Sequence, residues 1–222
     1  MSAMSVMPCR IIVMAKAPLP GQAKTRLQPA LGADGAARLA ERLLRHTVDQ
    51  ALQAELGLVT LCGAPDATHP AFADLLRDAP VQWSDQGEGD LGQRMARALC
   101  RALADADRAL LIGTDAPALD AAYLRQACHA LATHEAVFGP AFDGGYVLVG
   151  LQRPPQGVLP SRLEALFGQM AWSTPQVMGD TRKRLAGLGL RHAELSTLHD
   201  IDEPADLEHL PATWHDACTS VP

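Results

Sequence analysis

The sequence predicts a single α/β domain with a mainly parallel β-sheet. Short apolar segments rich in β-branched residues alternate with amphipathic segments of helical spacing along the 222 residues. This alternation is typical of βαβ units, in which a helix connects two parallel strands. The length suits one sizeable core, and no linker long enough to divide it interrupts the pattern. Residues 1–222 are therefore expected to form one domain.

The first half of the chain is predicted to contain four strands and three helices. The expected strands are the apolar segments 11–15, 56–62, 81–83 and 109–113. A long amphipathic helix over 35–53 is expected to begin at Asp34, whose carboxylate can cap it. A short helix is expected at 72–77. Asp90 is placed to cap a further helix that ends near residue 103.

The second half begins with a loop at 114–119 and a helix that Asp120 caps and that ends near residue 132. Strands at 136–141 and 146–150 follow. The turn between them, at 143–145, is short enough to make these two strands antiparallel. The remaining expected elements are helices at 162–167 and 174–188, a strand at 191–195 and a helix at 204–210. Asp202 is the expected cap of that last helix, with Pro204 in its first turn.

Composition excludes several classes of function. The net charge is −6 and no run of lysine and arginine exists, which argues against nucleic-acid binding. The five cysteines are scattered without a CxxC pair, which argues against a disulfide framework or a zinc site. No signal peptide is visible, and no segment approaches the roughly twenty apolar residues of a membrane helix. We therefore expect a cytoplasmic protein without a membrane span.

A basic loop follows the first predicted strand. It contains Lys16, Gly21, Lys24, Thr25 and Arg26, in a chain that is acidic overall. Cations and a glycine at the carboxyl end of a strand are suited to holding a phosphorylated ligand. The glycine spacing excludes a P-loop, because Gly21 stands three residues before Lys24. The alternative interpretation is a solvated basic turn.

Acidic residues gather at two other predicted strand ends. Asp115 comes directly after a buried strand, where it can hold a divalent cation against a diphosphate or simply form an Asx turn. Four acids lie between residues 200 and 206, although capping the last helix needs only one of them. A second metal ligand is a plausible use of the surplus.

Two glycine-bearing segments complete the set of candidates. The strand-to-helix junction with Gly89, Asp90 and Arg94 is suited either to hold a base or sugar or to make a tight turn. The segment Asp143-Gly144-Gly145-Tyr146, taken alone, is typical of a hairpin turn.

Together these segments resemble the bacterial DUF2064 family, often called radical-SAM/selenodomain-associated glycosyltransferases. The matching segments are residues 16–27, 89–95, 113–117, 139–146 and 200–204. The resemblance implies a Rossmann-like GT-A nucleotide-diphospho-sugar transferase fold with helices on both faces of the sheet. It also implies a nucleotide under the N-terminal loop, with Gly89, Asp90 and Arg94 among the residues that bind it.

The resemblance further implies Mg²⁺ or Mn²⁺ at Asp115 and an acceptor region at Asp143, Gly144, Gly145 and Tyr146. Related sugar-nucleotide cytidylyltransferases take a second metal carboxylate from a C-terminal segment. The corresponding residue here is Asp202. The sequence departs from GT-A glycosyltransferases at one point, because the metal position carries a single acid rather than a DxD pair. This departure favours a metal site like that of nucleotidylyltransferases.

The leading hypothesis is a metal-dependent transferase that uses a nucleotide-linked donor, with a glycosyltransferase acting on a nucleotide-diphospho-sugar as the first choice. The predicted catalytic residues are Lys24, Asp115 and Asp143. Lys24, with Lys16 and Arg26, would neutralise phosphates, and Asp115 with Asp202 would hold the metal. Asp143 would position an acceptor hydroxyl or take its proton as a general base.

Two alternatives stay open. A nucleotidylyltransferase would join an NTP to a phosphorylated acceptor and release pyrophosphate, using the same acids. A non-catalytic nucleotide-binding protein would bind nucleotide without regard to metal. In each case the expected partners are a nucleotide or nucleotide sugar and, for the enzymes, an unidentified acceptor.

Overall fold

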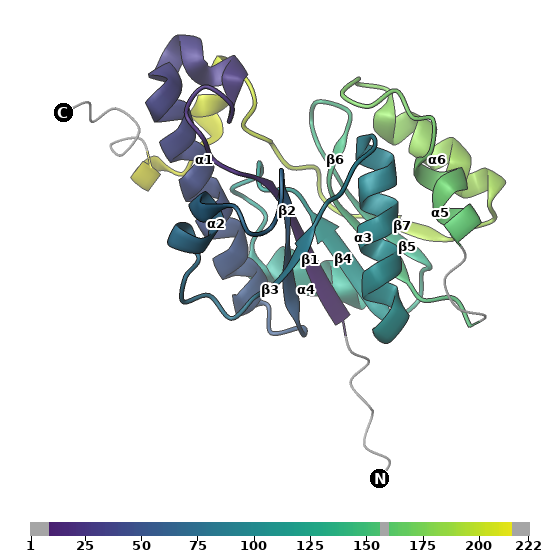
Figure 1. The fold of residues 1–222 in the computed structure, drawn as a ribbon. Coiled ribbons are helices and arrows are strands. Elements are labelled where there is room, and N and C mark those ends of the chain that lie inside the picture. The colour runs from purple at the N-terminus through teal and green to yellow at the C-terminus, as the bar shows by residue number, and fades with distance from the viewer. Residues whose placement is uncertain (1–8, 156–159, 215–222) are drawn as a thin grey trace.

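The computed structural model describes residues 9–155 and 160–214, and this part of the chain forms one α/β domain (Figure 1). Its seven strands lie in one sheet in the order β3-β2-β1-β4-β6-β5-β7. The strands are β1 Cys9–Lys16, β2 Val59–Ala64, β3 Gln82–Asp85, β4 Arg108–Ile112, β5 Ala136–Pro140, β6 Tyr146–Gln152 and β7 His192–Glu194. The predicted mainly parallel sheet is confirmed.

One strand, β6, runs against the others. It lies between β4 and β5 and pairs with both in antiparallel fashion, whereas the β1–β2, β1–β4, β2–β3 and β5–β7 pairs are parallel. The short 143–145 turn forces this direction, because it returns the chain directly beside β5. All parallel strands therefore end at one edge of the sheet, where the loops that follow them meet.

Helices cover both faces of the sheet, as expected (Figure 1). The helices are α1 Gln28–Gln53, α2 Pro70–Leu75, α3 Leu91–Asp105, α4 Ala121–Ala130, α5 Pro160–Phe167 and α6 Val177–Gly187. The α1, α2 and α4 helices pack on one face and α3, α5 and α6 on the other. Strand β1 shows the alternation that supports both layers: Ile11 and Val13 face the first layer and Ile12 the second.

Two helix starts match the expected caps. The Asp90 carboxylate accepts a hydrogen bond from the Gln93 amide at the start of α3, at 2.9 Å. The Asp120 carboxylate does the same for the Tyr123 amide at the start of α4, at 2.8 Å. Each cap satisfies a backbone N–H that the helix cannot pair itself.

The start of α1 differs from the prediction. The helix begins at Gln28, with Pro29 in its first turn, rather than after Asp34. The backbone leaves helical geometry at Gly32, where φ is 70° and ψ is 171°, and then resumes. The expected helix at 35–53 is thus the longer part of a kinked helix whose first turn the sequence pattern did not reveal.

The last predicted helix also differs. Residues Pro204–His209 form a 3₁₀ helix, and the residue at its N-cap is Glu203 rather than Asp202. The Asp206 carboxylate accepts hydrogen bonds from the amides of Asp202 and Glu203, at 2.9 and 2.7 Å. The Asp202 side chain is consequently free of the capping role that the sequence suggested.

The C-terminal segment packs along the outer side of α1. Leu210 and Trp214 join Leu39 and Leu43 of α1 in a small apolar cluster separate from the two main cores. The Arg42 guanidinium lies 4.5 Å from the centre of the Trp214 ring. This packing brings residues 201–214 back to Leu27, which closes the N-terminal loop (Figure 1). No helix in the described part of the chain is both long and apolar enough to span a membrane.

Candidate functional site

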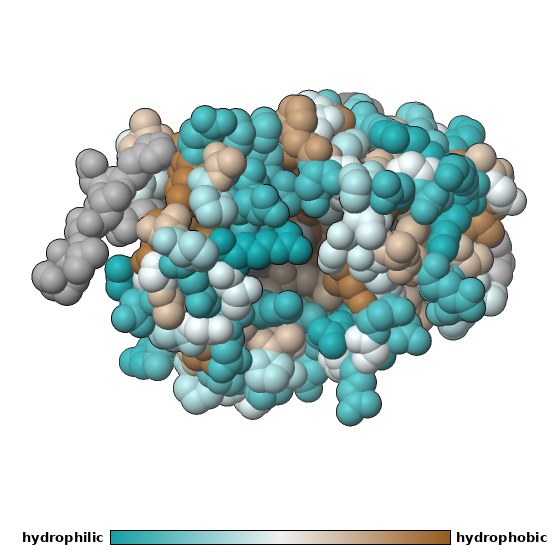
Figure 2. Space-filling model, turned by 90° about the horizontal axis from the view of Figure 1, so that it is seen from above, coloured by the Kyte–Doolittle hydropathy of each residue, from teal (hydrophilic) through white to brown (hydrophobic). Residues whose placement is uncertain are grey.

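The loops at the carboxyl edge of the parallel strands surround a hollow. Figure 2 looks down on this edge and shows the hollow near the centre of the face, rimmed by hydrophilic residues. The loop after β1 carries Lys24, the loop after β4 carries Asp115, and the segment after β7 carries Asp202. Open α/β sheets bind ligands at this edge, where strand order reverses beside β1 and β4.

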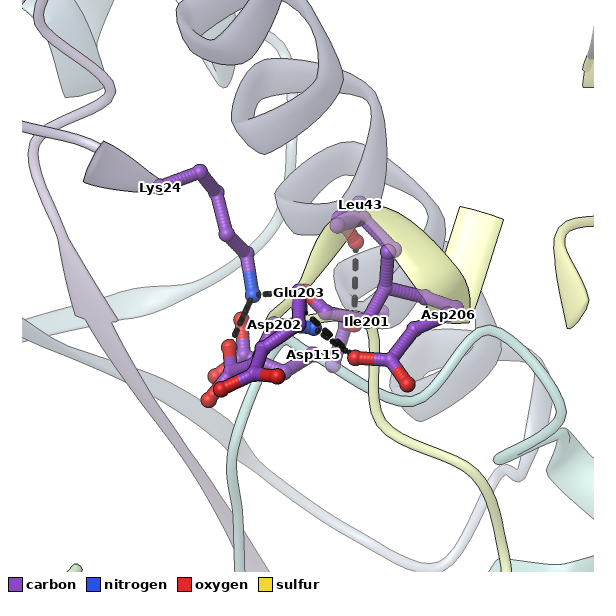
Figure 3. A network of polar contacts seen from close by, with 8 residues as sticks. Lys24, Leu43, Asp115, Ile201, Asp202, Glu203 and Asp206 are labelled. Carbon is purple, nitrogen blue, oxygen red and sulfur yellow. Dashed lines mark hydrogen bonds and ion pairs between the residues drawn. The ribbon is translucent and has the colours of Figure 1, made fainter. Parts of the chain in front are cut away.

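Lys24 joins the acids of two distant segments (Figure 3). Its Nζ forms ion pairs with the carboxylates of Asp115 and Asp202, the second at 2.9 Å. The same nitrogen donates a hydrogen bond to the Ile201 carbonyl at 2.7 Å. The Lys24 side chain is 8% exposed, whereas those of Asp115 and Asp202 are 45% and 43% exposed. A buried ammonium thus lies behind two carboxylates that remain open to solvent.

Backbone contacts hold this arrangement in place. Lys24 has φ 46° and ψ 46°, a left-handed conformation that is uncommon for a residue with a side chain. Ile201 is fully buried, and its amide donates to the Asp115 carbonyl at 2.9 Å. Because the Asp206 carboxylate accepts from the amides of Asp202 and Glu203, the acidic segment is held at three successive amides, beginning with that of Ile201 (Figure 3). The fold therefore fixes the backbone positions from which the Asp115 and Asp202 side chains extend.

Negative charge is in excess at this point. Burial, together with the charges of Asp143, Asp202 and Asp115, raises the pKa of the Asp200 carboxyl to about 6. Burial opposes the charged form of Lys24, but Asp115 and Asp202 outweigh it and raise the pKa of this ammonium above its usual value. Four aspartates therefore lie close enough to affect one another, and of these Asp115 and Asp202 pair with the buried Lys24 ammonium.

The residues present fit a divalent metal that arrives with phosphates. Carboxylate oxygens are the ligands that Mg²⁺ and Mn²⁺ prefer, and Mg²⁺ is commonly bound by one or two carboxylates with phosphate oxygens and water completing the shell. Asp115 and Asp202 already converge on a single cation, Lys24. Within the described residues, no group of three or more His, Cys, Asp or Glu side chains forms a complete metal site. Such a metal would need ligands from the substrate.

The predicted acceptor residues lie beside the acids. Asp143 is exposed in the turn between β5 and β6, and its Oδ1 accepts a hydrogen bond from the Gly145 amide at 2.7 Å. Gly144 has φ +90°, and a Cβ there would lie 2.2 Å from the Pro175 carbonyl oxygen. The Tyr146 hydroxyl is buried, and its ring contacts Phe138 and Trp172 edge to face. Asp143 is thus available to an acceptor, whereas the Tyr146 hydroxyl is turned into the core.

The glycine-rich loop before α3 is held by hydrogen bonds from the side chains of Arg94 and Gln86. Arg94 Nε donates to the Gly89 carbonyl at 2.8 Å, and Asp90 is occupied with capping α3. The buried Gln86 side chain donates to the carbonyls of Ala15 and Cys62, at 2.9 and 3.0 Å. The loop is therefore anchored to the ends of β1 and β2. Its predicted contact with a nucleotide would come from its backbone and the exposed Asp90.

The remaining predicted phosphate-binding residues are exposed at the rim. Lys16 lies at the end of β1 and Gly21 follows with φ +80°. Thr25 and Arg26 begin the short 3₁₀ turn after Lys24, and Arg26 is 3.9 Å from Glu203, with both side chains about two-thirds exposed. These side chains are not in the Lys24 contact network, but they border the same edge of the sheet.

Sequence reasoning missed two features of the site. It did not single out Asp200, although the surplus of acids at 200–206 was the signal. It also assigned no role to His199. In the structure, His199 stacks between Phe142 and His209, with ring centroids at 3.9 and 3.6 Å. The spacing of these three rings along the chain contains no pattern that predicts the stack.

Comparison with known proteins identifies the family of the chain. The model of DUF2064, described as an uncharacterized protein conserved in bacteria, matches residues 47–174. The chain belongs to the DUF2064 family. The matched range contains Asp115 and Asp143 of the site, whereas Lys24 and Asp202 lie outside it. No curated protein matches this DUF2064 chain.

Solved structures extend the similarity to almost the whole DUF2064 chain. A candidate nucleotide-diphospho-sugar transferase from Desulfovibrio desulfuricans G20 has a TM-score of 0.82 at 29% identity, covering 94% of this chain and 88% of that one. A 4-diphosphocytidyl-2C-methyl-D-erythritol synthase from Anaerococcus prevotii DSM 20548 has a TM-score of 0.63 at 11% identity, covering 95% and 100%. Rv0371c from Mycobacterium tuberculosis H37Rv, in complex with manganese, has a TM-score of 0.56 at 17% identity, covering 92% and 97%. The fold is that of nucleotide-using transferases.

Proposed function

We propose that the protein is a metal-dependent transferase that acts on a nucleotide-linked substrate. The observation that carries the proposal is the convergence of Asp115 and Asp202 on Lys24 at the ligand-binding edge of the sheet. Two half-exposed carboxylates beside a buried ammonium suit a metal-bound polyphosphate, since the carboxylates meet the metal and the ammonium meets phosphate oxygens. The manganese complex of Rv0371c, which shares the fold, is consistent with this chemistry.

The roles of the residues follow from their positions. Lys24 would neutralise charge on the phosphates, and the exposed Lys16 and Arg26 would add to this at the rim. Asp115 and Asp202 would hold Mg²⁺ or Mn²⁺, which when bound stabilises the charge on a departing diphosphate or pyrophosphate. Asp143 is exposed beside these acids and would position the acceptor or take its proton.

Nucleotidyl transfer is the reaction that this geometry supports best. The acid after β4 stands alone, since Thr114 and Ala116 flank Asp115, and its partner comes from the far end of the chain. A DxD pair, usual in GT-A glycosyltransferases, is absent from this loop. In the reaction, the acceptor phosphate would attack the α-phosphorus of an NTP and pyrophosphate would leave.

Glycosyl transfer from a nucleotide-diphospho-sugar is the second candidate. It is favoured by the similarity to the Desulfovibrio protein, which is described as a candidate nucleotide-diphospho-sugar transferase and matches over most of both chains. In this reaction the acceptor hydroxyl would attack the anomeric carbon and the nucleoside diphosphate would leave.

A single experiment separates the two reactions without knowledge of the acceptor. The protein is incubated with a panel of nucleotide-diphospho-sugars, Mg²⁺ or Mn²⁺, and pyrophosphate, and the nucleotide products are separated by chromatography. A nucleotidylyltransferase run in reverse yields NTP and a sugar phosphate, whereas a glycosyltransferase, with water taking the glycosyl group in place of the acceptor, yields NDP and the free sugar. Asp115→Asn serves as the matched control and should abolish either product.

The non-catalytic alternative predicts a different result. Nucleotides would then raise the melting temperature equally with and without metal, and no member of the panel would be consumed. That outcome, or full turnover by Asp115→Asn, would refute the proposed function.

A further inference from the structure

We propose that Lys24 is an internal counter-ion that occupies the metal position of the ligand-free protein and exchanges from carboxylate to phosphate when a metal–nucleotide complex binds. This inference rests on the proposed function. It assigns to one lysine two successive partners, the carboxylates of Asp115 and Asp202 first and the phosphates of the substrate second.

The contacts of Lys24 are those expected of a bound cation. Its nitrogen is surrounded by three oxygen ligands from the chain, namely the two carboxylates and the Ile201 carbonyl at 2.7 Å. The ammonium is almost completely buried, while the outer sides of both carboxylates face solvent. Figure 3 shows the side chain extending from the N-terminal loop and ending directly at the acids. The lysine thus uses the carboxylate oxygens that a metal would also use.

Charge balance explains why the two cations exclude each other. Asp115 and Asp202 carry two negative charges, and Lys24 neutralises one of them. A divalent ion would neutralise both, but a Lys24 ammonium held at the same oxygens would repel it strongly at this distance. The metal is therefore accommodated only if the ammonium moves away from the carboxylates.

Incoming phosphates provide the place for the ammonium to go. Lysine is a point charge on a flexible stem with three donors, so it can keep its backbone position and turn from one anion to another. Phosphate oxygens would replace the carboxylates of Asp115 and Asp202 as the anionic partners of the Lys24 ammonium. Metal alone offers no such exchange, and would leave a buried ammonium without an anion. Metal and nucleotide should consequently bind with positive coupling, each raising the affinity for the other.

Removal of Lys24 should have opposite effects on the binding of metal alone and on the binding of nucleotide. Lys24→Met should strengthen the binding of Mn²⁺ alone, because both carboxylates are then unneutralised, by at least about tenfold, or about 1.4 kcal/mol. The same change should weaken the binding of nucleotide in the presence of Mn²⁺, because the phosphates lose their lysine. If Lys24 only bound phosphate, its removal would weaken nucleotide binding without strengthening the binding of Mn²⁺ alone.

The test is a Mn²⁺ titration of the full chain, after removal of metal, with free Mn²⁺ measured by electron paramagnetic resonance. Wild type, Lys24→Met and Lys24→Gln are compared without nucleotide and with a nucleotide that raises the melting temperature of wild type in the presence of Mn²⁺. Lys183→Met is the matched control: it removes an equal charge from an exposed lysine of α6 that pairs with Asp180. Asp202→Asn in the Lys24→Met background should abolish the gain in Mn²⁺ affinity.

Melting temperatures supply a second readout that does not depend on activity. Without metal, Lys24→Met leaves two facing carboxylates unpaired and should melt below wild type. Added Mn²⁺ should then raise its melting temperature more than that of wild type or Lys183→Met.

The possible outcomes separate this inference from the proposed function. If Lys24→Met and Lys24→Gln bind Mn²⁺ alone no better than wild type, while wild type binds Mn²⁺ with nucleotide, the counter-ion role is refuted and the proposed function stands. If wild type does not bind Mn²⁺ even with nucleotide, both are refuted. A tenfold gain that persists when Asp202 is changed to Asn would also overturn the inference, because the metal would then be bound elsewhere.

Discussion

Asp206 is the residue that orients the second acid of the site. Its carboxylate accepts hydrogen bonds from the amides of Asp202 and Glu203, and the Ile201 amide before them is bonded to the Asp115 carbonyl. The backbone around Asp202 is therefore tied at successive peptide groups. We assign Asp206 a positioning role, since its side chain bonds to the backbone of Asp202 rather than to the position of the metal.

Loss of the Asp206 carboxylate should weaken ligand binding at the site more than it lowers the stability of the fold. Asp206→Ala removes the acceptor of two amides, and we expect it to weaken Mn²⁺-dependent nucleotide binding by roughly tenfold, consistent with about 1–2 kcal/mol for unpaired amides. Asp206→Asn keeps one acceptor oxygen and should recover part of this loss. Glu208→Ala, on the exposed side of the same 3₁₀ helix, is the control. Equal affinities for Asp206→Ala and Glu208→Ala in a calorimetric titration would contradict the positioning role.

Individual residues also show what sequence reasoning can and cannot supply. Lys24, Asp115 and Asp202 were predicted, because each is a charged residue at a strand end or in an acidic surplus. The resemblance implied that Asp115 and Asp202 meet at one site, but local pattern does not predict the contact of Lys24 with both, since it depends on the path of a segment far away in sequence. Asp202 was also expected to cap the last helix, and this was wrong because Glu203 takes that position and Asp206 supplies the bonds.

At the scale of elements, the turn between β5 and β6 is held by contacts with the start of α6. The Gly144 carbonyl accepts a hydrogen bond from the Met178 amide at 2.8 Å, and Gly144 itself faces the Pro175 carbonyl. This packing links the turn to the start of α6. The turn that carries Asp143 is therefore held from two sides, by the β5–β6 pairing and by α6.

A side chain at position 144 should disrupt this contact. Gly144→Ala combines a positive φ with a Cβ 2.2 Å from a backbone oxygen, and should cost about 2–4 kcal/mol. The melting temperature should then fall by roughly 5–15 °C. Gly179→Ala in α6 is the matched control, because a Cβ there meets nothing within 4 Å and the helix favours alanine. A melting temperature for Gly144→Ala equal to that of Gly179→Ala would show that the turn is not constrained as described.

Most elements could be predicted from sequence, with shifts of a few residues at their ends. The strands are short apolar runs bounded by polar or glycine residues, and Asp90 and Asp120 mark the starts of α3 and α4. The first turn of α1 was missed because Gly32 interrupts the helical pattern and hides the part before it. The final helix was expected at 204–210, and the structure shows that it is a 3₁₀ helix, a distinction that Pro204 and an acidic first turn do not make.

At the scale of the whole molecule, the C-terminal segment acts as a strap across α1. The side chain of Arg42 donates to the carbonyls of Thr213 and Trp214, and His46 contacts the Trp214 ring edge to face. His46 Nε2 also lies 2.9 Å from the Pro117 carbonyl, in the loop that follows Asp115. His46 of α1 thus contacts both the C-terminal strap and the loop that follows Asp115.

Removal of the anchor at the end of this strap should affect binding as well as stability. Trp214→Ala should destabilise the protein by about 3 kcal/mol through the loss of a large buried side chain. Leu185→Ala in α6 should cost a similar amount on the opposite face of the sheet, and serves as the control. At a temperature where both variants are folded, only Trp214→Ala should lower the affinity for Mn²⁺ and nucleotide. An equal loss in both would mean that the strap does not position Asp202.

The distance along the chain between Lys24 and Asp202 has a consequence for synthesis of the protein. The two residues in contact are 178 positions apart, so the lysine emerges from the ribosome long before its partner. A nascent chain that has completed six of the seven strands still lacks Asp202, because this residue follows β7. Unfinished or C-terminally cleaved chains should therefore leave the cellular nucleotide and metal pools untouched. Under the proposed function, binding would begin only once the segment that follows β7 has been synthesised.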